Sequence, residues 1–366
     1  MFKSTISFFI LYLLFFLSPT TSKGQPGLKS NEIKKEWWHI NRIKSFASAN
    51  PNLKKLDLIK VKGNSFIDEK GKVIVFKGVS ISDPDKLVKD GRWNKSHFEE
   101  IKKWGANVIR VPVHPVAFHQ RGVEEYIKLL DNAVEWCTDL GIYIIIDWHS
   151  IGNLRMEILS QDMHNTTQKE TFNFWRTIAS HYKDVPTVAF YELFNEPTTL
   201  NGQYGTCTWE EWKTLMEQII DVVYAHNKAA IPLVAGFNWA YDLTPVRLAP
   251  IAREGVAYVT HPYPGKRSKP REPKWEEDFG FVADKYPVMA TEIGFMKENE
   301  EDKNLNDDGS YGPSIINYFN KKGISWVVWV FDPVWVPQMI KSWNYEPTDQ
   351  GIFFRDVMQG KFKYSK

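Results

Sequence analysis

The chain has 366 residues, 43% of them hydrophobic, so it is long enough to bury a large core. Its 46 basic and 44 acidic side chains give a formal net charge of +2 and are well mixed, which argues against a nucleic-acid partner. The two cysteines, Cys137 and Cys207, lie far apart, so we expect two free thiols and no structural zinc.

The N-terminus has the layout of a secretory signal. One lysine precedes an apolar run from Ile6 to Leu17, and small polar residues follow it. This run is short for a helix that spans a membrane, so a retained anchor is the less favoured alternative. We expect residues 1–24 to be a signal peptide. The mature protein is then expected to be secreted or periplasmic, monomeric, and without membrane contact.

Two short segments precede the main part of the chain. Residues 25–60, around "EIKKEWWHINRIKSFAS", predict a helical extension. The next stretch, "IKVKGNSFIDEKGKVIVF", alternates apolar and polar residues around glycine-containing turns, which predicts a hairpin. We expect this hairpin to cover the bottom of a barrel, and we assign residues 61–366 to one catalytic domain.

From residue 75 onward, short apolar runs alternate with longer amphipathic ones. The predicted strands are 75–81, 107–113, 142–148, 187–195, 231–236, 256–263, 287–293 and 324–330. Helical patterns lie between them, such as 96–105, 124–141 and 208–229. Almost continuously apolar strands that alternate with helices indicate a parallel sheet covered on both faces.

Eight such units predict an α/β fold of the (β/α)₈ TIM-barrel type. A doubly wound sheet would need a glycine-rich phosphate loop after its first strand, where this chain has "SISDPDKL". In a barrel, functional residues gather at the carboxyl ends of the strands.

Polar residues stand at the predicted end of most of these strands. They are Arg110 and His114, Asp147 and His149, Asn195 and Glu196, His261 and Tyr263, Glu292, and the aromatic Trp329. Each has an ordinary explanation alone, but a stabilising role would favour the opposite end of the barrel. The set therefore predicts a site at the carboxyl-terminal rim.

Two carboxylates from separate strands, Glu196 and Glu292, fit glycoside hydrolysis. In that reaction one carboxylic acid protonates the leaving oxygen, and the other carboxylate attacks the anomeric carbon or activates water. Arg110 beside one carboxylate would keep it ionised. Glu192, four residues before Glu196, is expected to point into the barrel and brace Arg110 or a neighbouring polar group.

The motifs "LFNEP" and "TEIGF" resemble glycoside hydrolase family 5, and the likeness runs from about residue 60 to the C-terminus. The resemblance implies that Glu196 is the acid/base and Glu292 the nucleophile of a retaining enzyme that needs no cofactor. Tyr263 would hydrogen-bond Glu292, and Asn195 would bind the sugar 2-hydroxyl. His149 and His261 would line that subsite and Trp329 would form its floor. The carboxyl groups should then lie ~5–5.5 Å apart.

Further aromatic residues can flank the cleft. Trp335, in the loop after the eighth strand, is expected to stack on a neighbouring sugar, and Trp239 can border the cleft after the fifth. The acidic stretch 297–310 is expected to be a solvated loop without a role in the site.

The substrate expected first is a β-linked glucan that is cleaved internally. An endo-β-mannanase and an exo-acting β-glucosidase are the alternatives on the same scaffold. The first strand lacks the Gly-His ending of many family 5 cellulases, which argues against plain cellulose. Two other classes are less favoured: a metal-dependent hydrolase that uses His149, His261 and the glutamates, and a non-catalytic carbohydrate-binding protein, which would need neither Glu196 nor Glu292.

Overall fold

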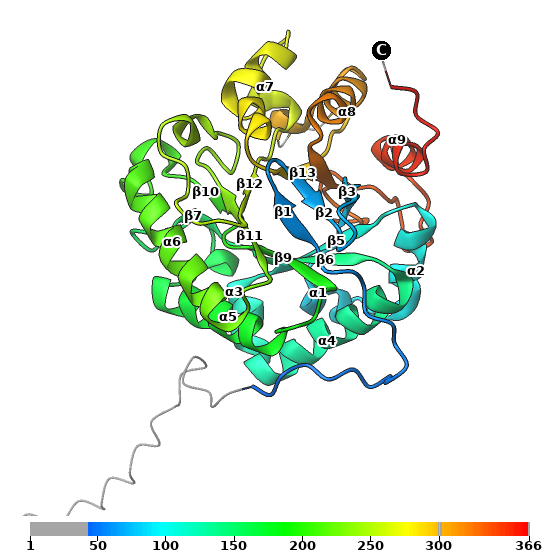
Figure 1. The fold of residues 1–366 in the computed structure, drawn as a ribbon. Coiled ribbons are helices and arrows are strands. Elements are labelled where there is room, and N and C mark those ends of the chain that lie inside the picture. Colours follow the sequence, from blue (N-terminus) through cyan, green and yellow to red (C-terminus); the bar gives the residue numbers. More distant parts are fainter. Residues whose placement is uncertain (1–42, 299, 301, 365–366) are drawn as a thin grey trace, which may run out of the picture. The chain divides into compact units, whose positions relative to one another are not determined.

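The computed structural model describes residues 43–298, 300 and 302–364. The predicted signal peptide and residues 25–42 lie outside the described residues. The main sheet is a closed, all-parallel barrel of eight strands in the order β11-β12-β13-β14-β4-β5-β6-β9 (Figure 1), which confirms the predicted TIM barrel. These strands are β4 (Lys77–Ser80), β5 (Val108–Val113), β6 (Tyr143–Trp148), β9 (Val188–Glu192), β11 (Ile231–Ala235), β12 (Ala257–Val259), β13 (Val288–Ile293) and β14 (Ser325–Val328).

Helices surround the barrel, as Figure 1 shows. They are α1 (Pro84–Lys89), α2 (Lys95–Lys103), α3 (Pro115–Arg121), α4 (Val123–Leu140), α5 (Gln168–His181), α6 (Trp209–His226), α7 (Glu272–Asp278), α8 (Tyr311–Lys322) and α9 (Asp349–Met358). Capping boxes start α5 at Thr167 and α6 at Thr208, where hydroxyl and glutamate side chains satisfy the free backbone N–H groups. Gly141 ends α4 in the left-handed conformation that glycine adopts at least cost.

The apolar core has two layers, because each barrel strand is buried on both faces. The inner layer contains Phe76, Val108, Phe190 and Met289, which point into the barrel. The outer layer lies between strands and helices and includes Trp148, whose ring stacks on Phe174 of α5. Trp148 therefore faces away from the barrel interior, as strand alternation predicts.

A small antiparallel sheet closes the amino-terminal end of the barrel. It consists of β1 (Lys60–Lys62), β2 (Ser65–Ile67) and β3 (Val73–Ile74). Phe66 of β2 packs edge-to-face on Phe76 and Phe190, with ring centroids 5.7 and 5.1 Å away. In Figure 1 this sheet lies across the barrel opening, so the predicted hairpin and its position are confirmed.

The predicted helical extension is wrong for the part that the structure describes. Residues 43–59 contain no helix. Phe46 donates its backbone N–H to the carbonyl of His181, and the backbone of Ala49 bonds the Glu135 side chain. The segment thus satisfies its polar groups on α5 and α4, and these contacts replace the hydrogen bonds of a helix.

Two further features bear on the expectations. Neither Cys137 nor Cys207 forms a disulfide, which confirms the prediction of free thiols. Among the described residues, every helix is too short or too polar to span a bilayer.

Candidate active site

The carboxyl ends of the strands border a cavity of about 520 Å³. Its lining includes six of the ten residues predicted at the strand ends, namely His149, Asn195, Glu196, Tyr263, Glu292 and Trp329. Residues of the loops after β11, β12 and β13 add to the wall, and Ile151 and Val336 complete it; the loop residues are Asn238, Trp239, Gly265, Lys266, Asp302, Asn304 and Leu305.

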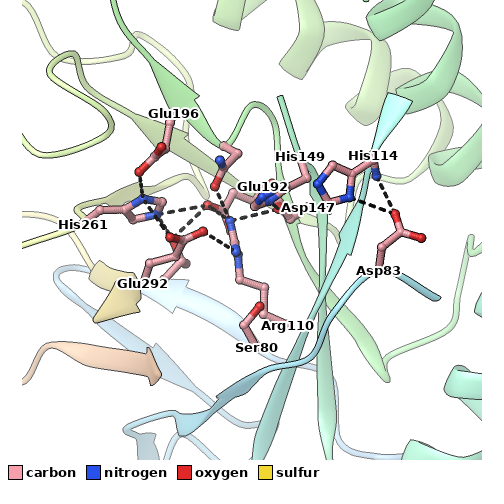
Figure 2. Close-up of polar contacts among 12 residues, drawn as sticks. Ser80, Asp83, Arg110, His114, Asp147, His149, Glu192, Glu196, His261 and Glu292 are labelled. Carbon is pink, nitrogen blue, oxygen red and sulfur yellow. Dashed lines mark hydrogen bonds and ion pairs between the residues drawn. The ribbon is translucent and has the colours of Figure 1, made fainter. Parts of the chain in front are cut away.

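Arg110 lies beneath this cavity and connects the polar groups of several strands. It projects from β5 and is fully buried. Its guanidinium donates to Glu192 of β9 at 2.7 and 3.0 Å, to Glu292 at 2.8 Å and to the Asn195 side-chain oxygen at 2.6 Å. The contact to a fourth partner, Asp147, measures 2.9 Å (Figure 2). The guanidinium is planar and has five N–H donors, so it can bond all these acceptors at once, which a lysine ammonium could not do.

Glu192 braces Arg110, as predicted. Phe190 lies in the inner core layer, so alternation aims Glu192 into the barrel as well. Its carboxylate also accepts a 2.8 Å bond from the Thr291 hydroxyl. Burial alone would raise the pKa of Glu192, but Arg110 and His261 outweigh burial and lower it to about 2.

Replacement of this brace is expected to destabilise the fold. Glu192→Gln should lower the free energy of unfolding at neutral pH by about 3 kcal/mol, because it leaves part of the buried guanidinium charge uncompensated. The folded pKa lies below the ordinary value of 4.5, so the carboxylate stabilises the fold above pH 4.5. This contribution is lost as the pH falls from 4.5 towards 2.

Urea denaturation across that pH window tests the prediction. The difference between wild type and Glu192→Gln should shrink as the pH falls, and a difference that stays constant would contradict it. Glu254→Gln is the matched control, because Glu254 is exposed.

Glu292 reaches the site through an irregularity in β13. The register of β13 against β14 shifts between Ala290 and Ile293, which is a β-bulge. Two consecutive side chains, Thr291 and Glu292, therefore both face the barrel interior. The Tyr263 hydroxyl donates to Glu292 at 2.9 Å. Burial raises the pKa of Glu292, while His261 and Arg110 oppose this rise.

Glu196 stands in the loop after β9. Its backbone N–H bonds the carbonyl of Ser150 at 3.1 Å, and β10 (Glu196–Pro197) pairs with β7 (Ile151–Asn153). The side chain accepts a 3.0 Å bond from His261 Nδ1 (Figure 2). One carboxylate oxygen of Glu196 lies within 4.8 Å of one oxygen of Glu292. That separation fits the spacing of retaining glycosidases, since inverting enzymes keep the two groups about 6.5–9.5 Å apart.

His261 does not line the cavity as the resemblance implied. It is fully buried behind the two glutamates, with Nε2 2.9 Å from the Thr291 hydroxyl. Burial alone would lower its pKa, but Glu292, Glu192 and Glu196 raise it to about 9. The imidazole is therefore positively charged at neutral pH, and it links the two glutamates electrostatically.

His149 and Trp329, which follow β6 and β14, form another side of the cavity. The carboxylate of Asp147 accepts a 2.6 Å bond from His149 Nδ1, and burial lowers the pKa of His149, so its Nε2 is an acceptor. The His149 ring is nearly parallel to Trp329, with centroids 5.3 Å apart. Trp335 is not among the cavity residues, but its ring lies nearly parallel to that of Trp329 at 5.8 Å.

A metal ion would have to compete with these internal bonds. Among the described residues, Glu196, His261 and Glu292 are the group whose ligand atoms lie close enough to share an ion. Both ring nitrogens of His261 already contact Glu196 and Thr291, so a metal there would displace one of them. The donor set therefore fits a metal poorly.

The acidic stretch 297–310 corrects a second expectation. It contributes Asp302, Asn304 and Leu305 to the cavity wall, although its composition predicted a solvated loop. Lys266 was also missed, because it follows the end of β12 by several residues. Its position directly after the "HPYPG" motif is the signal that could have identified it.

Comparisons with known proteins give a match to a family model. Residues 67–334 match the family model described as Cellulase (glycosyl hydrolase family 5). Endoglucanase A of Butyrivibrio fibrisolvens is 27% identical over 290 residues, which cover 76% of this chain. The chain spans 61% of the length of that endoglucanase.

Solved structures give a further match. A β-glucanase from Saccharophagus degradans, crystallised in complex with cellotetraose, is 50% identical with a TM-score of 0.86. The match covers 90% of this chain and 100% of that structure. The catalytic domain of the major endoglucanase from Xanthomonas campestris pv. campestris, 20% identical with a TM-score of 0.66, shares the fold. That match covers 82% of this chain and 99% of the domain.

Proposed function

The chain belongs to glycoside hydrolase family 5, and we propose that it cleaves internal β-linkages of a β-glucan by a retaining, double-displacement mechanism. The observation that carries this proposal is the pair Glu196 and Glu292, with carboxylate oxygens within 4.8 Å at the rim of the barrel. The β-glucanase that binds cellotetraose supports a glucan over a mannan.

In the first step Glu292 attacks the anomeric carbon while the glycosidic bond breaks. Arg110 and Tyr263 hold its two oxygens, at 2.8 and 2.9 Å, so the attacking carboxylate is oriented before substrate binds. The proton for the leaving oxygen comes from Glu196. His261 Nδ1 donates to one oxygen of Glu196 at 3.0 Å, which leaves the other oxygen to carry this proton.

In the second step Glu196 takes a proton from water, and the resulting hydroxide displaces Glu292 from the sugar. His149 offers an acceptor to a sugar hydroxyl, and Trp329 offers an apolar face to the ring. No group other than the chain, the substrate and water enters this sequence of steps.

A polysaccharide panel tests the proposal. The purified protein would be incubated with mixed-linkage β-glucan, laminarin, carboxymethylcellulose, glucomannan, galactomannan and xylan, and reducing ends and product sizes would be followed. We expect oligosaccharides of several lengths from mixed-linkage β-glucan. Release of glucose alone would indicate an exo-acting β-glucosidase, and turnover of galactomannan alone would indicate a mannanase. Either result would overturn the proposed substrate or mode of cleavage.

We also propose that the protein acts outside the cytoplasm, where such polymers occur. The pattern of residues 1–24 supports this location. Detection of the full-length chain in the cytoplasmic fraction alone would contradict it.

A further inference from the structure

Three consecutive residues after β11 have left-handed backbone conformations. Asn238, Trp239 and Ala240 have φ angles of +59°, +55° and +57°. Residues other than glycine disfavour the left-handed conformation, and three such residues in a row are costly in conformational free energy. Such conformations persist where surrounding contacts impose them, and they concentrate at ligand sites. We call residues 238–240 the left-handed turn.

Three contacts from two other loops hold this turn. The backbone N–H of Trp239 donates to the Pro197 carbonyl at 3.1 Å, and that of His261 donates to the Ala240 carbonyl at 3.2 Å. Pro197 directly follows Glu196, and His261 bonds Glu196, so the turn is joined to both segments that position the acid/base. The third contact is a 2.9 Å bond from Lys266 Nζ to the Asn238 carbonyl.

Lys266 also contacts the side chain of Trp239 in the turn. Its Nζ lies 4.9 Å from the centre of the Trp239 ring and 6.0 Å from that of Tyr241, within the range of cation–π attraction. The loop that carries Lys266 is itself fixed. Arg267 forms two 2.7 Å bonds to buried Asp278, and a Cβ atom on Gly265 would lie 2.5 Å from the Cα of Asn304.

The barrel order shows which side of the cleft these residues occupy. Around the rim, β11 and β12 lie between β9, which precedes Glu196, and β13, which carries Glu292. Trp239 and Lys266 follow β11 and β12, whereas Trp329 and His149 follow β14 and β6 on the other arc. Both pairs line the cavity that contains the two glutamates.

We propose that Lys266 is the positioning residue of the leaving-group side of the cleft: it fixes the left-handed turn and, with Trp239, forms the contact surface for the neutral hexosyl unit that departs. This inference rests on the proposed function, which assigns the arc of Trp329 and His149 to the sugar that remains on Glu292. The ammonium has further protons to donate to hydroxyls of the departing sugar.

The test compares two substrates of the wild type and of Lys266→Met. Cellopentaose places sugars on both sides of the cleaved bond, whereas 2,4-dinitrophenyl β-cellobioside leaves the leaving-group side without a sugar. We expect Lys266→Met to lower kcat/KM for cellopentaose roughly 10- to 100-fold. For the aryl glycoside the change should stay within about 2-fold, because its leaving group makes none of these contacts.

Two further variants complete the design. Lys266→Arg retains a cation over the ring and a donor to Asn238, so it should recover most of the activity on cellopentaose. Lys228→Met is the matched control. Lys228 also lies over an aromatic ring, with Nζ 3.9 Å from the centre of Tyr224, but it lies between α6 and the start of β11, at the opposite end of the barrel.

Equal losses on both substrates would show a merely structural role for Lys266, and no loss on either would show no role. Either outcome overturns the inference. A wild type that cleaves mannan but no glucan would overturn the proposed function alone. The same comparison of the two losses in kcat/KM, measured with mannopentaose and the aryl β-mannobioside, would then decide the role of Lys266.

Discussion

Glu292→Ala is expected to lower kcat/KM on β-glucan by about 10⁴-fold or more, because it removes the carboxylate that forms the bond to the sugar. Sodium azide should restore turnover by attacking the anomeric carbon in the space that the missing side chain leaves. The product would be a glycosyl azide of α configuration, since a single displacement inverts the anomeric centre. Thin-layer chromatography and NMR of the product measure this outcome.

The pH dependence gives a second measurement on the same residue. Burial raises the pKa of Glu292 above its usual 4.5, with His261 and Arg110 in opposition. The nucleophile must be ionised, so kcat/KM of the wild type should fall as the pH drops through a value higher than that of an ordinary glutamate. Full activity of Glu292→Ala, or an azide product of β configuration, would refute the assignment. Glu277→Ala, at an exposed glutamate of α7, is the control.

Glu196→Ala is expected to separate substrates by their leaving groups. On cellopentaose kcat/KM should fall about 10³-fold, because the leaving oxygen no longer receives a proton. With 2,4-dinitrophenyl β-cellobioside, whose leaving group needs no protonation, the first step should continue and the glycosyl-enzyme should accumulate. A burst of dinitrophenol followed by a slow steady rate, seen by stopped-flow absorbance, is the expected signature.

Azide distinguishes this variant from the previous one. Azide needs no general base, so it should accelerate the slow breakdown of the glycosyl-enzyme. The product should be a glycosyl azide of β configuration, the result of two displacements. Comparable losses on both substrates would contradict the role of Glu196 as acid.

Much of this site could be predicted because barrel strands follow simple rules. Apolar runs of four to eight residues mark the strands, and their last residues meet at one rim. Alternation aims Arg110 and Glu192 into the barrel with Val108 and Phe190, so their ion pair follows from position alone. The pair "NEP" and "TEIGF" then supplies the two carboxylates.

Three features were not predicted, and each depends on contacts between distant segments. Strict alternation would place Glu292 outside, since Thr291 before it points inward, and only the register of β13 against β14 reveals the bulge. Lys266 owes its position to the approach of Gly265 to Asn304, which are separated by a long stretch of chain. Residues 43–59 are held by contacts with α4 and α5. The sequence of this segment contains no local pattern that predicts these contacts.

The bulge of β13 has a consequence for anyone who would move this chemistry to another scaffold. One extra residue in the strand turns the nucleophile inward. The position of the carboxylate therefore depends on the number of residues in the strand as well as on the presence of the glutamate. A transplanted pair of glutamates on regular strands would send one carboxylate into the layer of helices. A designer would therefore need to copy the interruption in strand pairing, and a one-residue deletion within 290–293 should be more damaging than most substitutions there.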